Sequence, residues 1–383
     1  MTRALLITND FPPMGGGEAT CYARICASVP PDRIVVLAPR MAGDQAFDQA
    51  QAYRVIRRSA PTNPHPVARL LQIALLFVRA LRMIRSESID IVHIGHLHLG
   101  PIGLGLQRWR GVPYVLYLHG GEMAAYLRFR PIRAIARAIV EGAVVVVVNS
   151  AFTRQHYSAL GIRPARVETL TISPGTAQFG PDDQGRRIRA KYRLGDDKVI
   201  LTVGRLIERK GHDVVIRSLD RIRQTVGPVR YVIAGRGPEE MRLRALARAL
   251  GCEDTVHFIG YVPSEELPAL YAACNVFVMP SRVLTQRDGV EGFGIVFLEA
   301  AAASKPVVGG RSGGIPEVVL DNVTGRLVDP GDVDQLTEAL VQLLLDRHEA
   351  GRLGANGRRH AEAVEAAWSA TLRRIWDEPV RAG

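Results

Sequence analysis

Short apolar runs rich in β-branched residues recur along this chain and alternate with segments of helical periodicity, which constrains the fold more than any other feature. In the first half the runs occupy residues 4–8, 33–37, 89–94, 114–118 and 144–148. In the second half they occupy residues 199–203, 229–234, 256–258, 276–279, 306–308 and 325–328. Such alternation is typical of parallel sheets with crossover helices. The sequence therefore predicts an α/β protein with two doubly wound, Rossmann-like domains.

The alternation breaks at Pro174-Gly175, and a polar connector at residues 181–185 follows the break. A chain of 383 residues has the length of two domains. The predicted parts are an N-terminal domain of residues 1–178, a C-terminal domain of residues 179–360, and a C-terminal helix of about residues 361–383 that packs back on the N-terminal domain. Because doubly wound folds bind ligands at the carboxyl ends of their strands, we expect the domains to face each other across a cleft.

The net charge and the cysteines exclude several classes of protein. A net charge of +11 favours anionic ligands, acidic lipid or nucleic acid, but the arginines lack the aromatic interleaving and motifs of a nucleic-acid-binding surface. The four cysteines lack C-x-x-C spacing, so we expect neither a disulfide framework nor a zinc site. The first apolar run ends in Asn9-Asp10 and does not resemble a leader peptide, which favours a cytoplasmic protein.

The segment EGFGIVFLE, residues 291–299, places two carboxylates around a glycine-hinged helix start. Glycine lets the backbone approach a ligand closely, and the free N–H groups that begin the apolar helix can hold a diphosphate. Glu291 can then bind one end of a ligand, such as a sugar, while Glu299 binds the other, such as a ribose. The alternative is that Glu291 caps the helix and Glu299 makes a structural ion pair.

Two further segments offer groups that bind phosphate. In GRLIERKG, residues 204–211, Arg205 can hold phosphate oxygens in bidentate fashion and Lys210 can neutralise them, unless both are solvated surface charges. PPMGGGE, residues 12–18, is a glycine-rich turn between a strand and a helix, which offers backbone N–H groups to phosphate or is only a tight turn. The dinucleotide fingerprint G-x-G-x-x-G is missing there, which argues against a dehydrogenase.

His119 directly follows the apolar run 114–118, so we place it at a carboxyl end of the first sheet. An imidazole there can hydrogen-bond a substrate hydroxyl or shuttle a proton. Three more histidines lie close together in sequence without a carboxylate at ligand spacing, namely His93, His96 and His98. We expect no metal site at these histidines.

Asp332-Val333-Asp334 has the D-x-D form that some sugar-transferring enzymes use to bind a metal. Here Gln335 stands three residues after Asp332 and a helical pattern follows, which indicates a capping box. The sequence therefore predicts a structural role for Asp332 and no metal.

The segment 67–85 combines a wide apolar face with a stripe of polar residues, namely Arg69, Gln72, Arg79, Arg82 and Ser86. Its charges exclude a transmembrane span. The pattern fits a helix packed on the first sheet or one that lies on an anionic membrane surface. A second basic and apolar segment, residues 126–133, follows His119 and can line an acceptor pocket.

Taken together, these segments resemble the family 4 retaining glycosyltransferases of the GT-B fold. GRLIERKG, AGRGPEE, EGFGIVFLEA, GGIPEVV and NVTGRLVDPGD occur in the family's order and at its usual separations. The resemblance spans nearly the whole chain and implies an N-terminal domain for the acceptor and a C-terminal domain for the donor. It implies metal-independent transfer of a hexose-type sugar, with retention, from a UDP- or GDP-type nucleotide sugar to a hydroxyl of a lipid-linked or glycan acceptor.

The resemblance also assigns roles to individual residues. The implied catalytic residues are His119, Arg205, Lys210 and Glu291. The implied donor-binding residues are Gly16, Gly17, Gly204, Val262, Phe293, Gly294, Ile295 and Glu299. The implied acceptor-side residues are Glu18, Glu122, Tyr126 and Arg128. Ser264 stands where guanine-using relatives can have an acidic residue, which slightly favours uracil as the base.

Some relatives that act on lipid-linked acceptors are basic and sit at the cytoplasmic face of the membrane. The positive charge of this chain favours the same acceptor class, and a peripheral position on the inner face, with the nucleotide sugar as co-substrate and no other cofactor. The alternatives are a small-molecule glycosyltransferase of the same family and a nucleotide-sugar epimerase of the same fold, which would act without an acceptor.

Overall fold

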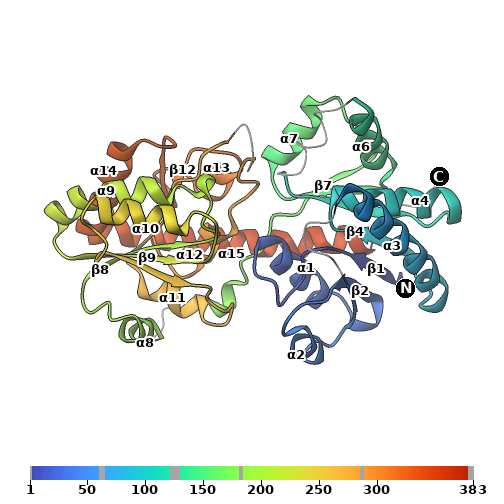
Figure 1. The fold of residues 1–383 in the computed structure, drawn as a ribbon, viewed down its shortest axis with the longest axis horizontal. Coiled ribbons are helices and arrows are strands. Elements are labelled where there is room, and N and C mark those ends of the chain that lie inside the picture. The colour runs from blue at the N-terminus through green and yellow to red at the C-terminus, as the bar shows by residue number, and fades with distance from the viewer. Residues whose placement is uncertain (1, 60–64, 121–129, 181–183, 285–288, 378–383) are drawn as a thin grey trace. The chain divides into compact units, whose positions relative to one another are not determined.

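The computed structural model describes residues 2–59, 65–120, 130–180, 184–284 and 289–377 (Figure 1). The chain divides into two compact units. The first unit comprises Met1–Thr171 and Trp368–Gly383, and the second comprises Ile172–Ala367. Each unit is built on one parallel sheet with helices between successive strands. The predicted α/β class with two doubly wound domains is therefore confirmed.

The first unit contains a seven-stranded sheet in the order β3-β2-β1-β4-β5-β6-β7. Its strands are β1 (Ala4–Ile7), β2 (Ile34–Pro39), β3 (Arg54–Arg58), β4 (Ile91–Ile94), β5 (Tyr114–Leu118), β6 (Val145–Val148) and β7 (Val167–Thr169). The five inner strands match the predicted runs and are almost wholly buried, as expected of parallel strands covered on both faces. Both edge strands, β3 and β7, were missed by the prediction because their side chains are only partly buried and their sequences are largely polar.

Helices cover the sheet of the first unit, and apolar side chains from strands and helices form one core cluster. The described helices are α1 (Gly17–Ala27), α2 (Asp44–Gln49), α3 (Pro66–Ser86), α4 (Gly100–Arg110), α6 (Arg130–Gly142) and α7 (Ala151–Ala159), with 3-10 turns η1 (Pro31–Arg33) and η2 (Leu97–Leu99). The prediction of a helix over residues 67–85 is confirmed by α3. Leu76, Ala80 and Met83 of α3 belong to the core cluster.

The second unit contains a six-stranded sheet in the order β10-β9-β8-β11-β12-β13. Its strands are β8 (Lys198–Val203), β9 (Val229–Ala234), β10 (Val256–Gly260), β11 (Val276–Met279), β12 (Val307–Gly310) and β13 (Gly325–Val328). Each coincides with a predicted run to within two residues at either end. Successive strands are added on one side of β8, as far as β10, and then on its other side, from β11 to β13. The strand order therefore reverses between β8 and β11, at the centre of the sheet. Such a switch point is where open α/β sheets bind ligands.

The described helices of the second unit lie before, between and after its strands in the sequence. They are α8 (Gln184–Lys191), α9 (His212–Val226), α10 (Glu240–Ala249), α11 (Leu267–Ala273), α12 (Ile295–Ala302), α13 (Ile315–Val318), α14 (Val333–Leu345) and the start of α15 (Arg347–Asp377), with 3-10 turns η3 (Thr176–Gln178) and η4 (Glu208–Lys210). The last residues of α15, from Trp368, belong to the first unit, where the Trp376 ring stacks on His93 with 4.4 Å between ring centroids.

Asp332 is the N-cap of α14, as the sequence predicts. One of its carboxylate oxygens accepts a hydrogen bond of 2.9 Å from the backbone N–H of Gln335. The Gln335 side chain differs from the predicted capping box, because it accepts a bond of 2.8 Å from the backbone N–H of Asp329 instead of Asp332. The structural role of Asp332 is thus confirmed, with two side chains satisfying two different backbone donors.

The cysteines and the lengths of the helices complete the description of the fold. All four cysteines are buried and free. Among the described residues, no helix combines the length and the apolar character that crossing a membrane requires.

Candidate active site

Residues 291–299 of the second unit form the predicted glycine-hinged helix start, which is the start of α12. Gly294 is the N-cap of α12 and has φ 90°, a conformation that L side chains rarely adopt. A Cβ atom at Gly294 would also lie 2.9 Å from the Phe297 side chain. Helix α12 is almost entirely buried, including Ile295, and Phe293 before it is buried too. The backbone N–H groups at its start are therefore held in one orientation by packing.

Glu291 lies just before this helix and pairs with two cations. Its Oε2 atom is 2.6 Å from Lys210 Nζ and 2.5 Å from Arg209 Nη1. All three side chains are 12–14% exposed, so little water screens them. Glu291 therefore makes the ion pair that the alternative interpretation assigned to Glu299. One carboxylate shared by two cations leaves an excess positive charge at this point.

Burial and neighbouring charges shift the pKa values of Glu291 and Lys210. Burial alone would raise the pKa of Glu291, but the charges of Lys210 and Arg209 hold that pKa at about 2. Burial lowers the pKa of Lys210, and Arg209 lowers it further, while Glu291 opposes both effects. The carboxylate is consequently ionised throughout the physiological range.

Arg209 was missed in the sequence, and the phosphate-binding role of Arg205 stays a prediction. The 3-10 turn η4 carries Arg209 and Lys210 to the same carboxylate. The Arg205 side chain is exposed, and its charge, like that of Arg209, lowers the pKa of Lys210. Gly204 lies beside this group, since a Cβ atom there would be 3.7 Å from Lys210 Cε. A contact across some eighty residues of sequence leaves no signal in local spacing.

Glu299 is oriented by a residue that the sequence analysis also missed. The fully buried Tyr271 of α11 donates a hydrogen bond of 2.7 Å from its hydroxyl to Glu299 Oε2. Tyr271 lies in an apolar stretch that indicates only a core position. Val262, the predicted neighbour of the base, is buried just after β10.

Glycine packing fixes the backbone of Glu291. Gly313 has φ 57°, and a Cβ atom there would lie 2.2 Å from the Glu291 carbonyl oxygen. The neighbouring Gly314 donates its backbone N–H to the same carbonyl at 2.9 Å. The GGIPEVV segment that contributes to the family resemblance is therefore the backbone support of Glu291.

In the first unit, the glycine-rich turn leads into α1. Gly16 is the N-cap with φ 133°, and α1 begins at Gly17. A Cβ atom at Gly16 would meet nothing within 4 Å, so its conformation, and not crowding, requires glycine. Glu18 lies in the first turn of α1, with its Oε2 atom 3.5 Å from Nδ1 of His96.

His119 is buried directly after β5, as predicted from its position in the sequence. Its Nε2 atom lies 2.6 Å from the hydroxyl of Tyr22, which is fully buried in α1. The same hydroxyl donates a hydrogen bond to the backbone carbonyl of Gly95, just after β4. His119 therefore lies where the carboxyl ends of two adjacent strands and one helix meet.

Folding gives His96 the carboxylate neighbours that its local sequence lacks. Asp10 Oδ2 lies 2.9 Å from Nε2 of His96, and Glu18 lies on the Nδ1 side of the ring. Burial would raise the pKa of Asp10, but its bond to His96 and the charges of nearby histidines lower it. His93 is separate from this group, because it is buried and bonded at 2.9 Å to the Tyr117 hydroxyl.

One group among the described residues has the composition of a metal site. Glu18, His96 and His119 each offer a ligand atom, and these atoms lie within 4.8 Å of one another. Two imidazoles and a carboxylate suit a transition-metal ion. Glu122, Tyr126 and Arg128, predicted on the acceptor side, lie outside the described residues.

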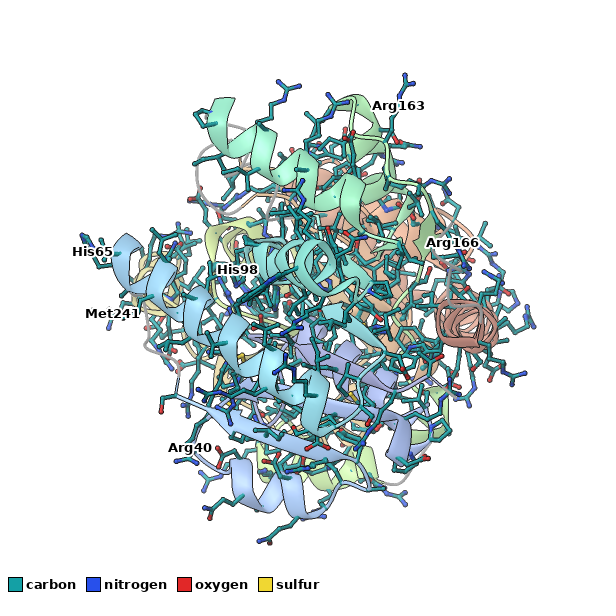
Figure 2. The ribbon with its side chains drawn as sticks, turned by 90° about the vertical axis from the view of Figure 1, so that its right-hand side faces the viewer. Arg40, His65, His98, Arg163, Arg166 and Met241 are labelled. Carbon is teal, nitrogen blue, oxygen red and sulfur yellow. The ribbon has the colours of Figure 1, made fainter. Side chains whose placement is uncertain are left out.

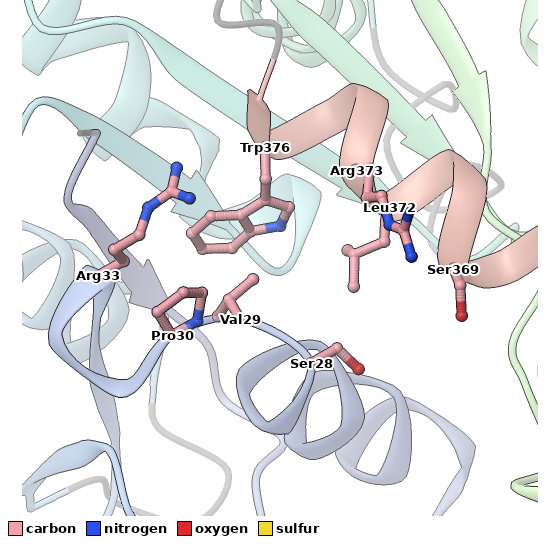
Figure 3. Close-up of a pocket in the computed structure, with 8 residues that line it drawn as sticks. All are labelled: Ser28, Val29, Pro30, Arg33, Ser369, Leu372, Arg373 and Trp376. Atoms are coloured by element: carbon pink, nitrogen blue, oxygen red, sulfur yellow. The ribbon is translucent and has the colours of Figure 1, made fainter.

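The first unit also has a cavity of about 320 Å³ beside the last turns of α15 (Figure 3). Val29, Pro30, Leu372 and Trp376 give it apolar walls, and Arg33 and Arg373 lie at its side. None of the predicted site residues lines this cavity, so the candidate active site lies elsewhere.

Comparison with known proteins assigns this arrangement to a class. The chain matches the family model "Glycosyl transferases group 1" over residues 185–360 and the model "Glycosyltransferase Family 4" over residues 16–171. Sucrose-phosphate synthase from Thermosynechococcus elongatus has a similar structure, with a TM-score of 0.83, 21% identity and coverage of 99% of both chains. HepE of Anabaena, in complex with UDP and glucose, gives a TM-score of 0.82 at 20% identity over 98% of this chain and 99% of that one. The fold is that of the GT-B glycosyltransferases.

Similar sequences define the family. The GDP-mannose-dependent alpha-(1-6)-phosphatidylinositol monomannoside mannosyltransferase of Mycobacterium tuberculosis H37Rv is 38% identical over 96% of this chain and 95% of its own length. The protein of the same description from Mycolicibacterium smegmatis is 37% identical over 93% of both chains. The chain belongs to the family 4 glycosyltransferases, and it is a nucleotide-sugar glycosyltransferase. The family, the fold and the enzyme class predicted from the sequence are thus confirmed.

Proposed function

We propose that the enzyme transfers a mannosyl residue from GDP-mannose to a hydroxyl of a phosphatidylinositol-type glycolipid, with retention of configuration and without a metal ion. The observation that carries the proposal is the buried group at Glu291, where Lys210 and Arg209 supply two cations for one carboxylate. The relatives named as GDP-mannose-dependent, at 37–38% identity over most of the chain, support the choice of donor and acceptor. Guanine thus replaces the slight preference for uracil drawn from Ser264.

In this proposal the second unit binds the donor. Lys210 and Arg209 stabilise the negative charge that develops on the departing diphosphate, which is the largest catalytic contribution expected in such a site. The N–H groups at the start of α12 bind phosphate or sugar oxygens. Arg205 is an additional cation, close enough for its charge to lower the pKa of Lys210. Glu299, held by Tyr271, accepts hydrogen bonds from the ribose hydroxyls.

The first unit binds the acceptor, with His119 near the reacting carbon and Glu18 on the acceptor side. We assign retention to displacement on one face of the sugar. The bond from the anomeric carbon to the diphosphate oxygen breaks while the bond to the acceptor oxygen forms on the same face. The departing phosphate oxygen takes the acceptor proton, so that no enzyme nucleophile is needed.

Binding of the donor base is the direct test of this proposal. We expect GDP to raise the melting temperature more than UDP, ADP or dTDP, since a ligand at about 100 times its Kd adds roughly 2.7 kcal/mol to the free energy of unfolding. Differential scanning fluorimetry with the four diphosphates measures this. A larger shift with UDP would refute the guanine assignment, and a shift with none of them would refute the donor site.

The exposed face of α3 supports a lipid acceptor. Five apolar side chains of this helix are 44–68% exposed, namely Val67, Leu70, Leu71, Leu75 and Val78. Exposed arginines flank them at Arg69 and Arg82. Figure 2 shows α3, with its N-cap residue His65 labelled at one end. A helix that packs one side on the core and presents an apolar, basic side to solvent is suited to an anionic membrane surface.

Vesicle sedimentation tests this surface. We expect salt-sensitive binding to vesicles that contain phosphatidylinositol. Leu71→Glu/Leu75→Glu should weaken this binding by about tenfold or more, because two exposed leucines that would enter the membrane are lost and two repelling charges are gained. Met241→Glu is the matched control, since Met241 is an 84% exposed apolar residue on α10 of the other unit. Equal binding by wild type and the α3 variant would contradict the membrane role.

A further inference from the structure

The segment that follows β11 supports the turn that carries the two cations of the candidate site. Strands β8 and β11 are neighbours at the switch point of the second sheet, and η4 follows β8 while Arg282 follows β11. The backbone N–H of Arg282 donates a hydrogen bond of 2.9 Å to the carbonyl of Arg209. Just beyond η4, a Cβ atom at Gly211 would lie 2.3 Å from the carbonyl oxygen of Pro280. The turn η4 therefore rests directly on residues 280–282.

The side chain of Arg282 makes a second attachment, on the C-terminal side of η4. Its Nη2 atom lies 2.9 Å from Oδ1 of Asp213, and its Nη1 atom lies 3.3 Å from Oδ2. Asp213 is in the first turn of α9, which begins two residues after Lys210. A two-pronged bond between a guanidinium and a carboxylate fixes direction as well as distance. Arg282 thus holds the chain at Arg209, within η4, and at Asp213, just after it.

The same pair neutralises a carboxylate that is close in sequence to the two cations. Asp213 has Arg282 as its partner, and Lys210 and Arg209 both pair with Glu291. In the part of the chain that the structure describes, Arg282 and Asp213 make no hydrogen bond or ion pair with Glu291. Their influence on that group is therefore exerted through η4.

We propose that Arg282 is a positioning residue for sugar transfer, whose bond to Asp213 fixes η4 so that Lys210 and Arg209 meet the departing diphosphate in one orientation. This assignment rests on the proposed function for the identity of the diphosphate. Charge stabilisation requires groups that are held in place before the reaction, and a displacement of about 1 Å can cost on the order of 10²-fold in rate. Loss of the Arg282 side chain should therefore act through Lys210 and Arg209.

A second arginine–aspartate pair of the same unit provides a matched control. Arg230 Nε lies 2.6 Å from Asp197 Oδ2, and these side chains are 33% and 24% exposed, against 20% and 12% for Arg282 and Asp213. Arg230 is the second residue of β9, and Asp197 directly precedes β8. This pair lies at the amino ends of the strands, whereas η4 follows the carboxyl end of β8. Arg230→Ala therefore removes a similar pair without touching η4.

Hydrogen–deuterium exchange of the full chain, followed by mass spectrometry, reads the turn without any substrate. The backbone N–H groups of Lys210 and Gly211 donate to carbonyls within η4 or just before it, and opening of such bonds limits exchange. We expect faster exchange in peptides that contain η4 in Arg282→Ala, and also in Asp213→Asn, which breaks the pair from its other side. We expect no change there in Arg230→Ala. Wild-type exchange in both variants of the pair, or equal acceleration in Arg230→Ala, would overturn the proposal.

A double-mutant cycle tests the consequence for transfer. Arg282→Ala should lower kcat/KM by about tenfold or more in the wild type, but by less than about threefold in the Lys210→Ala background, since residues that act through one another are not additive. Arg230→Ala should change kcat/KM by less than about twofold. An equal loss in both backgrounds would show an effect independent of Lys210 and overturn the proposal. If the wild type transfers no sugar at all, the proposed function fails, and the exchange experiment still decides whether Arg282 fixes η4.

Discussion

Replacing Lys210 with alanine is expected to lower kcat/KM for sugar transfer by about 10²- to 10³-fold, as for removal of one charge-stabilising group from a transition state. Lys210 Nζ lies 2.6 Å from Glu291 Oε2 in a largely buried setting. Its removal leaves Arg209 as the remaining cation on that oxygen. Steady-state kinetics with donor and acceptor varied in turn measures the loss.

Lys191→Ala is the control for a lost lysine charge. Lys191 pairs with Glu266 at 2.6 Å, but both side chains are well exposed, at 47% and 37%. Exposed pairs of this kind contribute about 0–1 kcal/mol, so turnover should stay within about twofold of wild type. Near-normal turnover in Lys210→Ala would contradict the assigned role of the lysine.

Replacing Glu291 with alanine is expected to impair both activity and stability. It leaves the Lys210 and Arg209 charges buried without their carboxylate, and breaking a buried pair in this way costs about 3–5 kcal/mol. We expect kcat/KM to fall by about 10² or more, because the two cations lose the group that fixes their positions. Kinetics and chemical denaturation measure the two effects, with Glu266→Ala as the exposed control. A stable, active Glu291→Ala variant would refute the central place given to this group.

The dependence of stability on pH gives an independent measure of the interaction of Glu291 with Lys210 and Arg209. The pKa of Glu291 is lowered to about 2 from 4.5 by its cations, so its contribution to stability is complete above pH 4.5 and is lost as the pH falls toward 2. The difference in unfolding free energy between wild type and Glu291→Gln should therefore be largest above pH 4.5 and shrink below it. A difference that stays constant down to about pH 2 would mean that the charge of Glu291 adds nothing.

The inner strands of both sheets could be predicted because burial on both faces demands continuous apolar runs. The inner strands β5, β9 and β11 have the predicted bounds. So does β13, an edge strand whose residues are mostly buried. The edge strand β3, with the sequence RVIRR, escaped because one side of an edge strand faces solvent and tolerates arginine.

In the candidate site, too, the features made by neighbouring residues could be predicted from the sequence, and the contacts between distant segments could not. The glycine-hinged start of α12 is a local feature, and its sequence predicts it. Arg209 on Glu291, Tyr271 on Glu299 and Tyr22 on His119 join segments that are distant in the chain. Nothing in the spacing of a single sequence separates these partners from ordinary surface or core residues.

Transfer of mannose from GDP-mannose to the lipid can be followed in one assay. The purified enzyme is incubated with GDP-mannose carrying a ¹³C label at the anomeric carbon and with phosphatidylinositol-mannoside vesicles, in buffer with EDTA, and the lipid product is analysed by NMR. We predict that the label appears in the glycolipid with the α configuration of the donor. Label that stays in GDP-mannose, or that reaches the lipid with inverted configuration, would contradict the proposed reaction.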